Sequence, residues 1–180
     1  MSKKTVFLGL ASVVCLALFL TTSCASLKDK ITKRDSRPPI KTVMVTGNFM
    51  EPRLICELAQ YRSQSPLFIF TPAENGGEPR VFYMSGNNKA EEIPVAGFAE
   101  FLDYLKPKVV VFLGGSTYCP QKYIDQASSQ FRTYTVTGPD WTKNAQSMGD
   151  ILGQPRLLRD YKDAMERLAK TGQLPPNAGK

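Results

Sequence analysis

Residues 106–116, with the sequence KPKVVVFLGGS, decide the fold. The uninterrupted apolar run at 109–113 is too short for a helix, and its β-branched valines suit a strand that is buried on both faces. Two glycines end this run and Pro120 stands where a helix would begin, which predicts a helix over residues 119–130. The strand-loop-helix unit indicates an α/β fold with 109–113 as its central strand.

Strand and helix signals alternate along the rest of the folded part. Strands are expected at residues 42–46, 67–70 and 132–136, and helices after 49, over 98–105 and over 141–152. Residues 73–95 break the alternation with a short strand at 81–84 and a turn at 86–88, which predicts a hairpin insertion. The whole pattern predicts a three-layer, Rossmann-like α/β domain over residues 42–153, with a mostly parallel sheet of about four strands.

Apolar residues at helical spacing mark the helix faces that we expect to be buried. They are Leu54, Ile55, Leu58 and Tyr61 in the helix after residue 49, and Phe98, Phe101, Leu102 and Leu105 in the helix at 98–105. A C-terminal amphipathic helix within residues 154–172 carries a third stripe, Leu157, Leu158, Tyr161, Met165 and Leu168. Stripes of this kind most often pack on the protein's own core, and residues 173–180 are expected to be a frayed tail.

The N-terminus has the pattern of an export signal. Two lysines precede an apolar run at residues 6–20, which is shorter than the roughly 20 residues of a membrane span and favours a signal peptide over residues 1–23. Small residues before Cys24 resemble the lipobox of bacterial lipoproteins, which predicts a fatty-acyl anchor such as palmitate on Cys24. Leu20 lies one place further from the cysteine than in the usual pattern, and ordinary cleavage after Ala25 is the alternative.

Most of the chain's net positive charge lies near the N-terminus. The chain has a formal net charge of +7, but residues 24–41 alone hold six basic residues against Asp29 and Asp35. From residue 42 onward 15 basic residues face 14 acidic ones, so the folded part has no excess charge to attract nucleic acid. Residues 24–41 also contain two prolines, which predicts a basic linker that acts as a tether. Its charge could rest on anionic headgroups, but a solvated spacer is the favoured interpretation.

The chain contains no histidine, and this restricts its chemistry. A Ser-His-Asp or Cys-His nucleophile system, a histidine zinc site and a histidine general base are all excluded. The glycine-rich fingerprints of dinucleotide and P-loop sites are also missing. We therefore predict a protein that is not an enzyme and has no metal and no cofactor.

Two of the four cysteines, Cys56 and Cys119, lie in the predicted domain. An exported protein is in an oxidising compartment, where these two residues could form a disulfide. Cys119 also stands near a helix start, a position that can lower the pKa of a thiol. The favoured interpretation is that both are unpaired and packed in the interior, because free cysteine behaves as a small hydrophobe.

Four segments in order resemble the type 2 cell wall-binding repeat of bacterial surface proteins. The family's first strand and helix correspond to Gly47, Phe49, Leu58 and Ala59, and its Pro-Ile-Leu-Leu strand corresponds to residues 66–69. Its Lys-Val-rich strand with a final Gly-Gly corresponds to residues 108–115, and its Gly-x-Asp helix start corresponds to Gly138, Asp140, Ala145 and Met148. The chain departs from the family at residues 51–53 and 141–142, and in the hairpin insertion.

The resemblance implies a Rossmann-like fold and binding of a bacterial cell-wall polymer. Family members carry tandem copies that associate and bind an anionic wall polymer near the Pro-Ile-Leu-Leu motif, whereas this chain has one copy. A homo-oligomer would restore such a grouping, and the apolar stripe of the C-terminal helix is one surface that could join the copies. The resemblance and the signal together imply an exported lipoprotein of the cell envelope. If the cell is Gram-negative, the protein would be at the periplasmic face or the outer membrane.

The hypothesis that we prefer is a membrane-tethered, non-catalytic domain that binds cell-wall glycan or another anionic polymer. In parallel α/β sheets ligands gather where the strands end. The candidate ligand-binding residues at that edge are Asn48, Thr71, Gly114, Gly115, Ser116, Asp140 and Trp141. Backbone N–H groups of the two glycines and the ring of Trp141 would contact the ligand, while a simple tight turn and core packing are the alternatives for them.

Two other classes of function stay open at this point. A small-molecule-binding or enzymatic Rossmann-like domain would use the same strand-end loops, with Glu51 and Asp140 as an acid/base pair. Both carboxylates also stand where helix starts favour them, so capping is the stronger interpretation. The third class is a scaffold for another protein, with the C-terminal helix as its docking element.

Overall fold

A six-stranded sheet forms the middle of the domain. The computed structural model describes residues 40–73, 76–86 and 89–172. The strands are β1 (Thr42–Gly47), β2 (Leu67–Thr71), β3 (Arg80–Met84), β4 (Ala90–Ile93), β5 (Val109–Leu113) and β6 (Arg132–Val136). They lie in the order β4-β3-β2-β1-β5-β6.

Four of these strands are parallel and two form a hairpin. β2, β1, β5 and β6 run in one direction, with Met44 beside both Leu67 and Val111 in the register of the sheet. β3 and β4 are antiparallel and extend the sheet from β2. The predicted mostly parallel α/β sheet is therefore confirmed. The predicted number of strands was too low, because the hairpin insertion joins the main sheet instead of lying apart from it.

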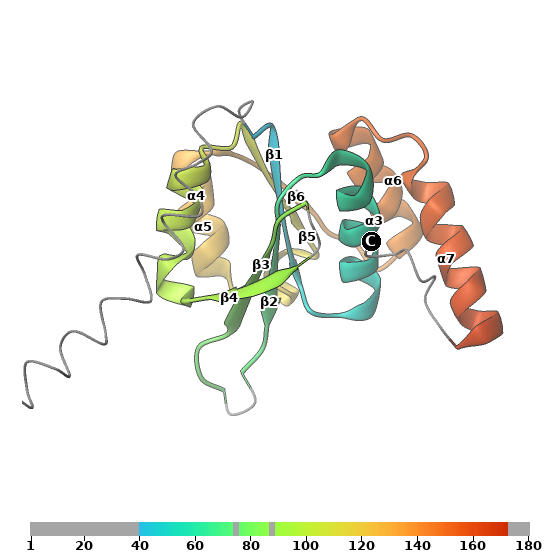
Figure 1. Cartoon of the computed structure of the whole chain (residues 1–180), viewed down its shortest axis with the longest axis horizontal. Coiled ribbons are helices and arrows are strands. Elements are labelled where there is room, and N and C mark those ends of the chain that lie inside the picture. Colours follow the sequence, from blue (N-terminus) through green and yellow to red (C-terminus); the bar gives the residue numbers. More distant parts are fainter. Residues whose placement is uncertain (1–39, 74–75, 87–88, 173–180) are drawn as a thin grey trace, which may run out of the picture. The chain divides into compact units, whose positions relative to one another are not determined.

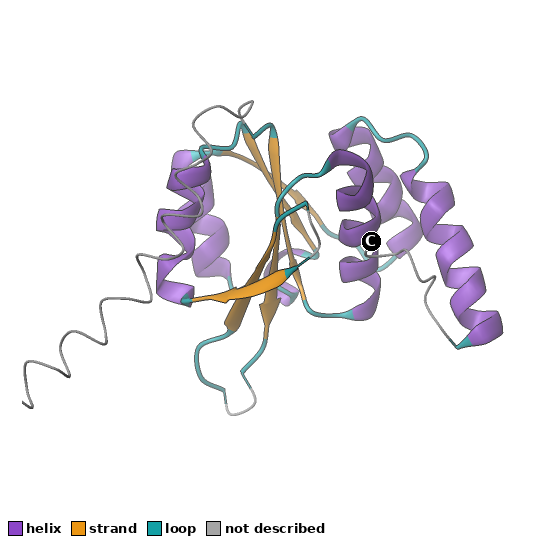
Figure 2. Cartoon of the chain, viewed as in Figure 1, coloured by secondary structure: helices purple, strands orange, loops and turns teal. Residues whose placement is uncertain are grey.

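Helices cover both faces of the sheet. One face is covered by α4 (Phe98–Leu105) and α5 (Gln121–Gln130), and the other by α3 (Met50–Ser63), α6 (Trp141–Leu152) and α7 (Leu157–Thr171). Short 3₁₀ turns, η1 (Val95–Gly97) and η2 (Gly115–Thr117), precede α4 and α5. Figures 1 and 2 show the sheet standing between these two groups of helices. The arrangement confirms a layered α/β architecture that is compatible with a Rossmann-like fold.

β5 is an interior strand, as its apolar run predicted. Val110, Val111 and Phe112 are completely buried, because helices lie over both faces of the strand. β5 has β1 on one side and β6 on the other, so it stands next to an edge strand and β1 lies closer to the centre of the sheet. The prediction that β5 is the central strand was wrong in this respect. The hairpin shifted the centre by adding two strands beyond β2.

The buried face of α3 differs in part from the predicted stripe. Leu54 and Ile55 are buried, but Tyr61 is 55% exposed. Cys56, Ala59 and Gln60 are buried in its place. The amide of Gln60 is satisfied there, because its Nε2 donates to the carbonyl oxygen of Met84 over 2.9 Å. An inward-facing glutamine thus ties the C-terminal end of α3 to the hairpin.

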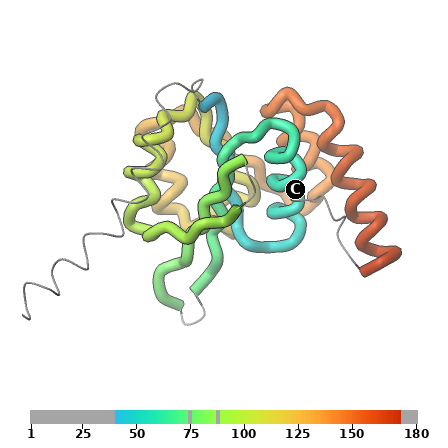
Figure 3. The backbone as a smooth tube through the Cα atoms, viewed as in Figure 1, coloured from blue at the N-terminus to red at the C-terminus, as the bar shows by residue number. Residues whose placement is uncertain are grey.

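The apolar stripe of α7 packs within the same chain. Leu157 and Tyr161 are buried in the cluster that α3, α6 and the sheet form, and Leu158 and Met165 pack at its margin. Figure 3 shows α7 lying alongside α3 and α6. An ion pair between Arg62 and Asp160 joins α3 to α7. Two of the five residues of the stripe thus pack in the chain's own core, whereas Leu158, Met165 and Leu168 are partly exposed.

Several predictions fall on residues that the structure does not describe. The signal peptide (residues 1–23), Cys24, the linker (24–41) except for its last two residues, and the tail (173–180) all lie outside the described residues. Within the described part of the chain, no helix has both the length and the apolar content needed to cross a membrane.

Candidate functional site

The predicted ligand-binding residues lie at one end of the sheet, which we call the carboxyl edge. The carboxyl edge is the end where the parallel strands β1, β2, β5 and β6 finish. Asn48 follows β1 and Thr71 ends β2, while residues 114–116 follow β5. Asp140 and Trp141 come after β6, at the start of α6. The parallel register therefore places all seven residues at the same edge.

The chain reverses its direction across the sheet between β1 and β5. β2 lies on one side of β1, whereas β5 and then β6 lie on the other, so the order switches at the carboxyl ends of β1 and β5. Crevices at such switch points are the usual ligand sites of open α/β sheets. Gly47 and Gly114 stand at the two strand ends that border this point.

Tyr118, which the sequence analysis did not single out, covers the switch point. A Cβ atom on Gly47 would lie 2.8 Å from both Cβ and O of Tyr118. A Cβ atom on Gly114 would lie 2.3 Å from Cδ2 of the same ring. Both glycines are thus required by the close approach of Tyr118. The position of Tyr118 just after a Gly-Gly turn was the available signal.

Tyr118 forms a cluster with two other aromatic residues, Phe49 just before α3 and Trp141 at the start of α6. The ring centroids of Phe49 and Tyr118 are 4.8 Å apart with an interplanar angle of 77°, and those of Tyr118 and Trp141 are 5.6 Å apart at 71°. Edge-to-face contacts of this kind stabilise a cluster beyond the apolar area that it buries. We call Phe49, Tyr118 and Trp141 the aromatic trio.

The aromatic trio is partly exposed to solvent. Phe49 is 41% exposed and the neighbouring Met50 is 48% exposed, although both are large apolar side chains. Tyr118 and Trp141 are half-buried, and Trp141 also packs against the hydrophobic core. Both interpretations of Trp141, core packing and an aromatic surface, thus agree with its position. The carboxyl edge presents an apolar and aromatic surface with polar residues around it.

The two glycines after β5 have a structural role. Gly114 and Gly115 have positive φ angles of 97° and 61°, a region that other residues rarely adopt. The N–H of Gly114 donates to the carbonyl oxygen of Val136 over 2.8 Å. The prediction that this N–H contacts a ligand was therefore wrong, because the group already has a partner. A Cβ atom on Gly115 would lie 2.5 Å from Cγ2 of Thr137. Substitution of either glycine is therefore expected to change the stability of the fold, whether or not a ligand binds there.

Asp140 caps α6, as predicted. Its Oδ1 accepts hydrogen bonds from the backbone N–H groups of Thr142 (2.9 Å) and Lys143 (3.3 Å). This satisfies two amide groups that have no partner inside the helix. Both bonds use the same carboxylate oxygen, so Oδ2 takes no part in the cap. Asp140 itself is exposed.

Asn48 and Thr71 are polar groups at the ends of β1 and β2. The side-chain oxygen of Asn48 accepts from Nη1 of Arg53 over 2.9 Å, and Nε of Arg53 donates to Glu57 over 2.6 Å. The guanidinium of Arg53 is thereby held within α3. The Oγ1 atom of Thr71 is buried and has no hydrogen-bond partner in the described structure. A buried hydroxyl without a partner is uncommon in native proteins.

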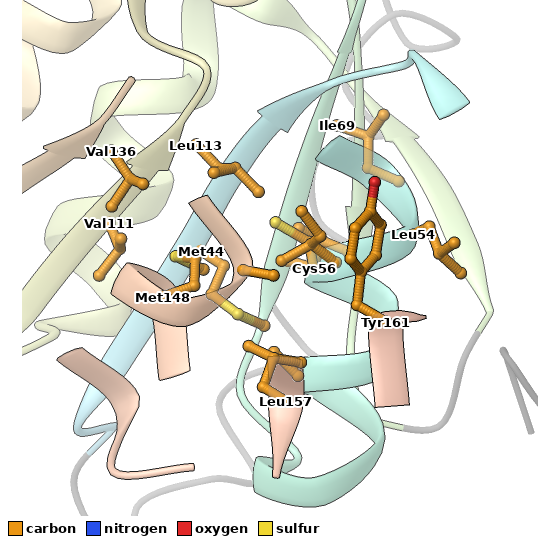
Figure 4. Packing of buried hydrophobic residues seen from close by; sticks show 14 of the residues in the cluster. Met44, Leu54, Cys56, Ile69, Val111, Leu113, Val136, Met148, Leu157 and Tyr161 are labelled. Atoms are coloured by element: carbon orange, nitrogen blue, oxygen red, sulfur yellow. The ribbon is translucent and has the colours of Figure 1, made fainter. Parts of the chain in front are cut away.

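Tyr161 is a buried phenol of α7, on the face of the sheet that α3, α6 and α7 cover. Tyr161 is 5% exposed, and burial raises the pKa of its hydroxyl. The negative charges of Glu51 and Asp140 raise this pKa further, so both carboxylates lie within electrostatic reach of the phenol. In Figure 4 the ring of Tyr161 lies beside Leu54 and its hydroxyl points away from Leu157.

The opposite side of the carboxyl edge is closed by a second polar group. Glu78, in the loop after β2, accepts from Nζ of Lys122 at 2.7 Å and from the hydroxyl of Tyr123 at 2.9 Å. Hydrogen bonds from Lys122 and Tyr123 lower the pKa of Glu78. The loop is thereby fastened to the first turn of α5.

The two cysteines of the domain are unpaired and buried. No disulfide joins them, in agreement with the favoured interpretation. Burial raises the pKa of Cys119 to about 12, and burial also raises the pKa of Cys56. The alternative of a lowered pKa at Cys119 was therefore wrong, because its thiol is shielded from water. Neither thiol is set up as a nucleophile.

The described residues hold no group of three or more Cys, Asp or Glu side chains that would bind a metal ion. Comparison of the chain with models of protein families, with curated proteins and with solved structures found no match. The carboxyl edge must therefore be interpreted from its own geometry. That geometry combines partly exposed aromatic rings with carboxylates, hydroxyls and an amide.

Proposed function

We propose that the protein is a lipid-tethered component of the cell envelope whose α/β domain binds cell-wall glycan without turnover. The observation that carries this proposal is the partly exposed aromatic trio at the topological switch point of the sheet. The resemblance of residues 43–152 to a cell wall-binding repeat supports the same class of ligand.

The chemistry of the carboxyl edge suits a sugar polymer. A sugar ring has an apolar C–H face and a rim of hydroxyl groups, and partly exposed aromatic rings offer the complementary apolar surface. Asn48, Ser116 and Asp140 lie at the same edge of the sheet as the trio and can exchange hydrogen bonds with hydroxyl groups. The lack of histidine and of a reactive thiol is compatible with binding in place of catalysis.

We expect Phe49→Ala to weaken binding to purified cell-wall fractions by about tenfold or more, because truncating an exposed aromatic anchor removes contact area with the ligand. The melting temperature should change little, since the ring is 41% exposed. A pull-down with the soluble domain and a thermal melt measure the two effects.

The matched control for Phe49→Ala is Tyr104→Ala. Tyr104 is also aromatic and is 39% exposed, but it belongs to α4 and takes no part in the aromatic trio. The control should bind wall fractions as the wild type does. Equal binding by all three proteins would contradict the proposed site. If the domain binds no wall fraction and turns over a small substrate, the enzyme hypothesis replaces this one.

The tether is proposed from the sequence before the described residues. Metabolic labelling with a fatty-acid probe should mark the full-length protein and leave Cys24→Ala unmarked, because the lipobox cysteine is the acceptor of the lipid. Cys15→Ala, within the signal, is the control and should still give a labelled product. Equal labelling of wild type and Cys24→Ala would show that Cys24 is not the anchor.

A further inference from the structure

The sheet ends in two edge strands that differ in their side chains. Within the described residues, β4 and β6 each have a neighbouring strand on one side only. β4 is four residues long and includes Glu91 and Glu92, and Glu92 forms an ion pair with Arg80. Short length and charged side chains are common means by which proteins keep an edge strand from pairing with another chain. β4 is therefore a protected edge.

β6 lacks these forms of protection. Its sequence, RTYTV, has one charged residue, at the first position, and contains no proline or glycine. Its register with β5 continues without a bulge over the whole strand. Arg132 and Thr135 are exposed and Tyr134 is half-buried, so the helices over the sheet do not cover this strand completely. β6 is thus a regular strand whose outer side can pair with another strand.

The backbone groups on the outer side of β6 follow from its ladder with β5. The carbonyl oxygen of Val136 accepts from the N–H of Gly114 over 2.8 Å, so the backbone groups of Val136 point toward β5. Successive residues of a strand direct their N–H and C=O groups to alternate sides. Those of Tyr134 therefore also point toward β5, whereas those of Thr133 and Thr135 point to the outer side. Among the described residues, no other strand pairs with them.

We propose that β6 is the contact surface for a second copy of this chain, whose own β6 pairs with it in the antiparallel direction about a two-fold axis at Tyr134. In this register Tyr134 stands opposite Tyr134 of the second copy, and Thr133 stands opposite Thr135. Each Thr133 and Thr135 pair exchanges both of its N–H···O bonds, which uses the backbone groups on the outer side of both strands. The two sheets then form one continuous sheet.

The sequence of β6 is self-complementary in this pairing. Thr133 and Thr135 flank Tyr134 symmetrically, so the pairing places threonine opposite threonine and tyrosine opposite tyrosine, which are favourable cross-strand pairs. A two-fold contact needs such a surface. Arg132 stands opposite Val136 of the other copy, so the two arginines are about 13 Å apart along the strands and their repulsion is largely screened by salt. A strand of an unrelated protein would not be expected to share this symmetry, which favours a second copy as the partner.

Tyr134 supplies the apolar part of the contact. Its ring packs at the margin of the hydrophobic core, and the guanidinium carbon of Arg132 lies 5.1 Å from the ring centroid. Opposite residues of a ladder lie on the same face of the sheet, so the half-buried ring meets the same ring of the second copy. The contact therefore extends a core that each copy already has. The antiparallel pairing also directs the two carboxyl edges in opposite directions.

Cysteine cross-linking of the full chain tests the register. In Tyr134→Cys the two new thiols stand opposite each other at a separation that a disulfide can span, so mild oxidation should give disulfide-linked dimers. Thr135→Cys is the matched control, because the Cα atoms of its two cysteines are about 8 Å apart, too far for a disulfide. The wild type reports any cross-link through the chain's own cysteines. Electrophoresis without reductant should show no more dimer for Thr135→Cys than for the wild type.

A proline tests the hydrogen bonds between the copies without removing one from the ladder with β5. The N–H of Thr135 points to the outer side, where an edge strand tolerates proline. Thr135→Pro should raise the dissociation constant of the dimer about tenfold or more, because each copy loses a donor and leaves an acceptor unpaired. Thr135→Val keeps the N–H at the same exposed position and should associate as the wild type does. Sedimentation equilibrium of the full chain measures association, and circular dichroism shows which variants are folded.

The outcomes are independent of the proposed function, because association is measured without wall fractions. Disulfide-linked dimers of Tyr134→Cys, with weaker association of folded Thr135→Pro, support the pairing of β6. A wild type that sediments as a monomer at every concentration overturns it. A dimer that folded Thr135→Pro retains in full also overturns it, because another surface, such as the exposed side of α7, would then join the copies. If Thr135→Pro does not fold, the cross-link decides alone, and its absence in Tyr134→Cys overturns the inference.

Discussion

Val111→Asp should unfold the domain. Val111 is fully buried in β5, with Met44 and Tyr134 beside it in the register of the sheet. A carboxylate at this position has no water and no partner, so we expect a loss of roughly 4 kcal/mol or more, which is much of the stability of a typical domain. Circular dichroism at 25 °C and a thermal melt would show the loss of cooperative unfolding.

The control for Val111→Asp is Ala90→Asp. Ala90 begins β4 and is exposed, so the same side chain is solvated there. The melting temperature of this variant should stay within a few degrees of the wild type, as is usual for surface substitutions. An unchanged melting temperature in Val111→Asp would show that β5 is not an interior strand.

The sequence predicted most of the elements because their local signals agree with the fold. The bounds of β6 (Arg132–Val136) and α6 (Trp141–Leu152) match the expected residues, since a β-branched run and an N-cap aspartate mark them clearly. The hairpin was also expected. Its place in the main sheet was not, because pairing between β2 and β3 depends on tertiary contacts that periodicity does not show.

The errors in the buried faces have a common physical cause. Tyr61 has the spacing of a core residue, but α7 packs on the other flank of α3 and Gln60 turns inward to bond the hairpin. The buried surface of a helix depends on which neighbours cover it, and the sequence alone did not place α7 against α3. A buried glutamine is predictable only once its carbonyl partners at residues 65, 84 and 85 are known.

The carboxyl edge was predictable as a location and only partly as a site. The ends of β1, β2, β5 and β6 could be aligned from the parallel pattern, which brought Asn48, Gly114 and Asp140 together in advance. Tyr118 could not be assigned to the site, because its place at the switch point depends on the close approach of Gly47, at the end of β1, and Gly114, just after β5.

Tyr118 links the stability of this edge to the proposed binding surface. Its ring contacts the rings of both Phe49 and Trp141, so its position determines how the aromatic trio is presented. The space for the ring exists because Gly114 has no side chain, and Gly47 leaves room for Cβ and O of Tyr118. A change at either glycine should therefore alter both folding stability and ligand binding.

Gly114→Ala should lower the free energy of unfolding by about 2–5 kcal/mol. A positive φ contributes roughly 1–2 kcal/mol of this loss in a residue other than glycine, and the clash with Tyr118 contributes the remainder. The φ angle is 97°, and the new Cβ would meet Cδ2 of Tyr118 at 2.3 Å. Binding to wall fractions should fall as well, because the ring must move. Denaturant unfolding and the pull-down measure the two losses.

Two further variants separate backbone strain from the clash. Gly153→Ala has the same kind of backbone, with a φ angle of 66°, but nothing lies within 4 Å of the new Cβ, so it should lose only about 1–2 kcal/mol. In the background of Tyr118→Ala, Gly114→Ala should also lose only this smaller amount, because contacting residues are not additive. Equal losses for Gly114→Ala in both backgrounds would show that the ring of Tyr118 does not limit this turn, and the coupling between β5 and the aromatic trio would then be absent.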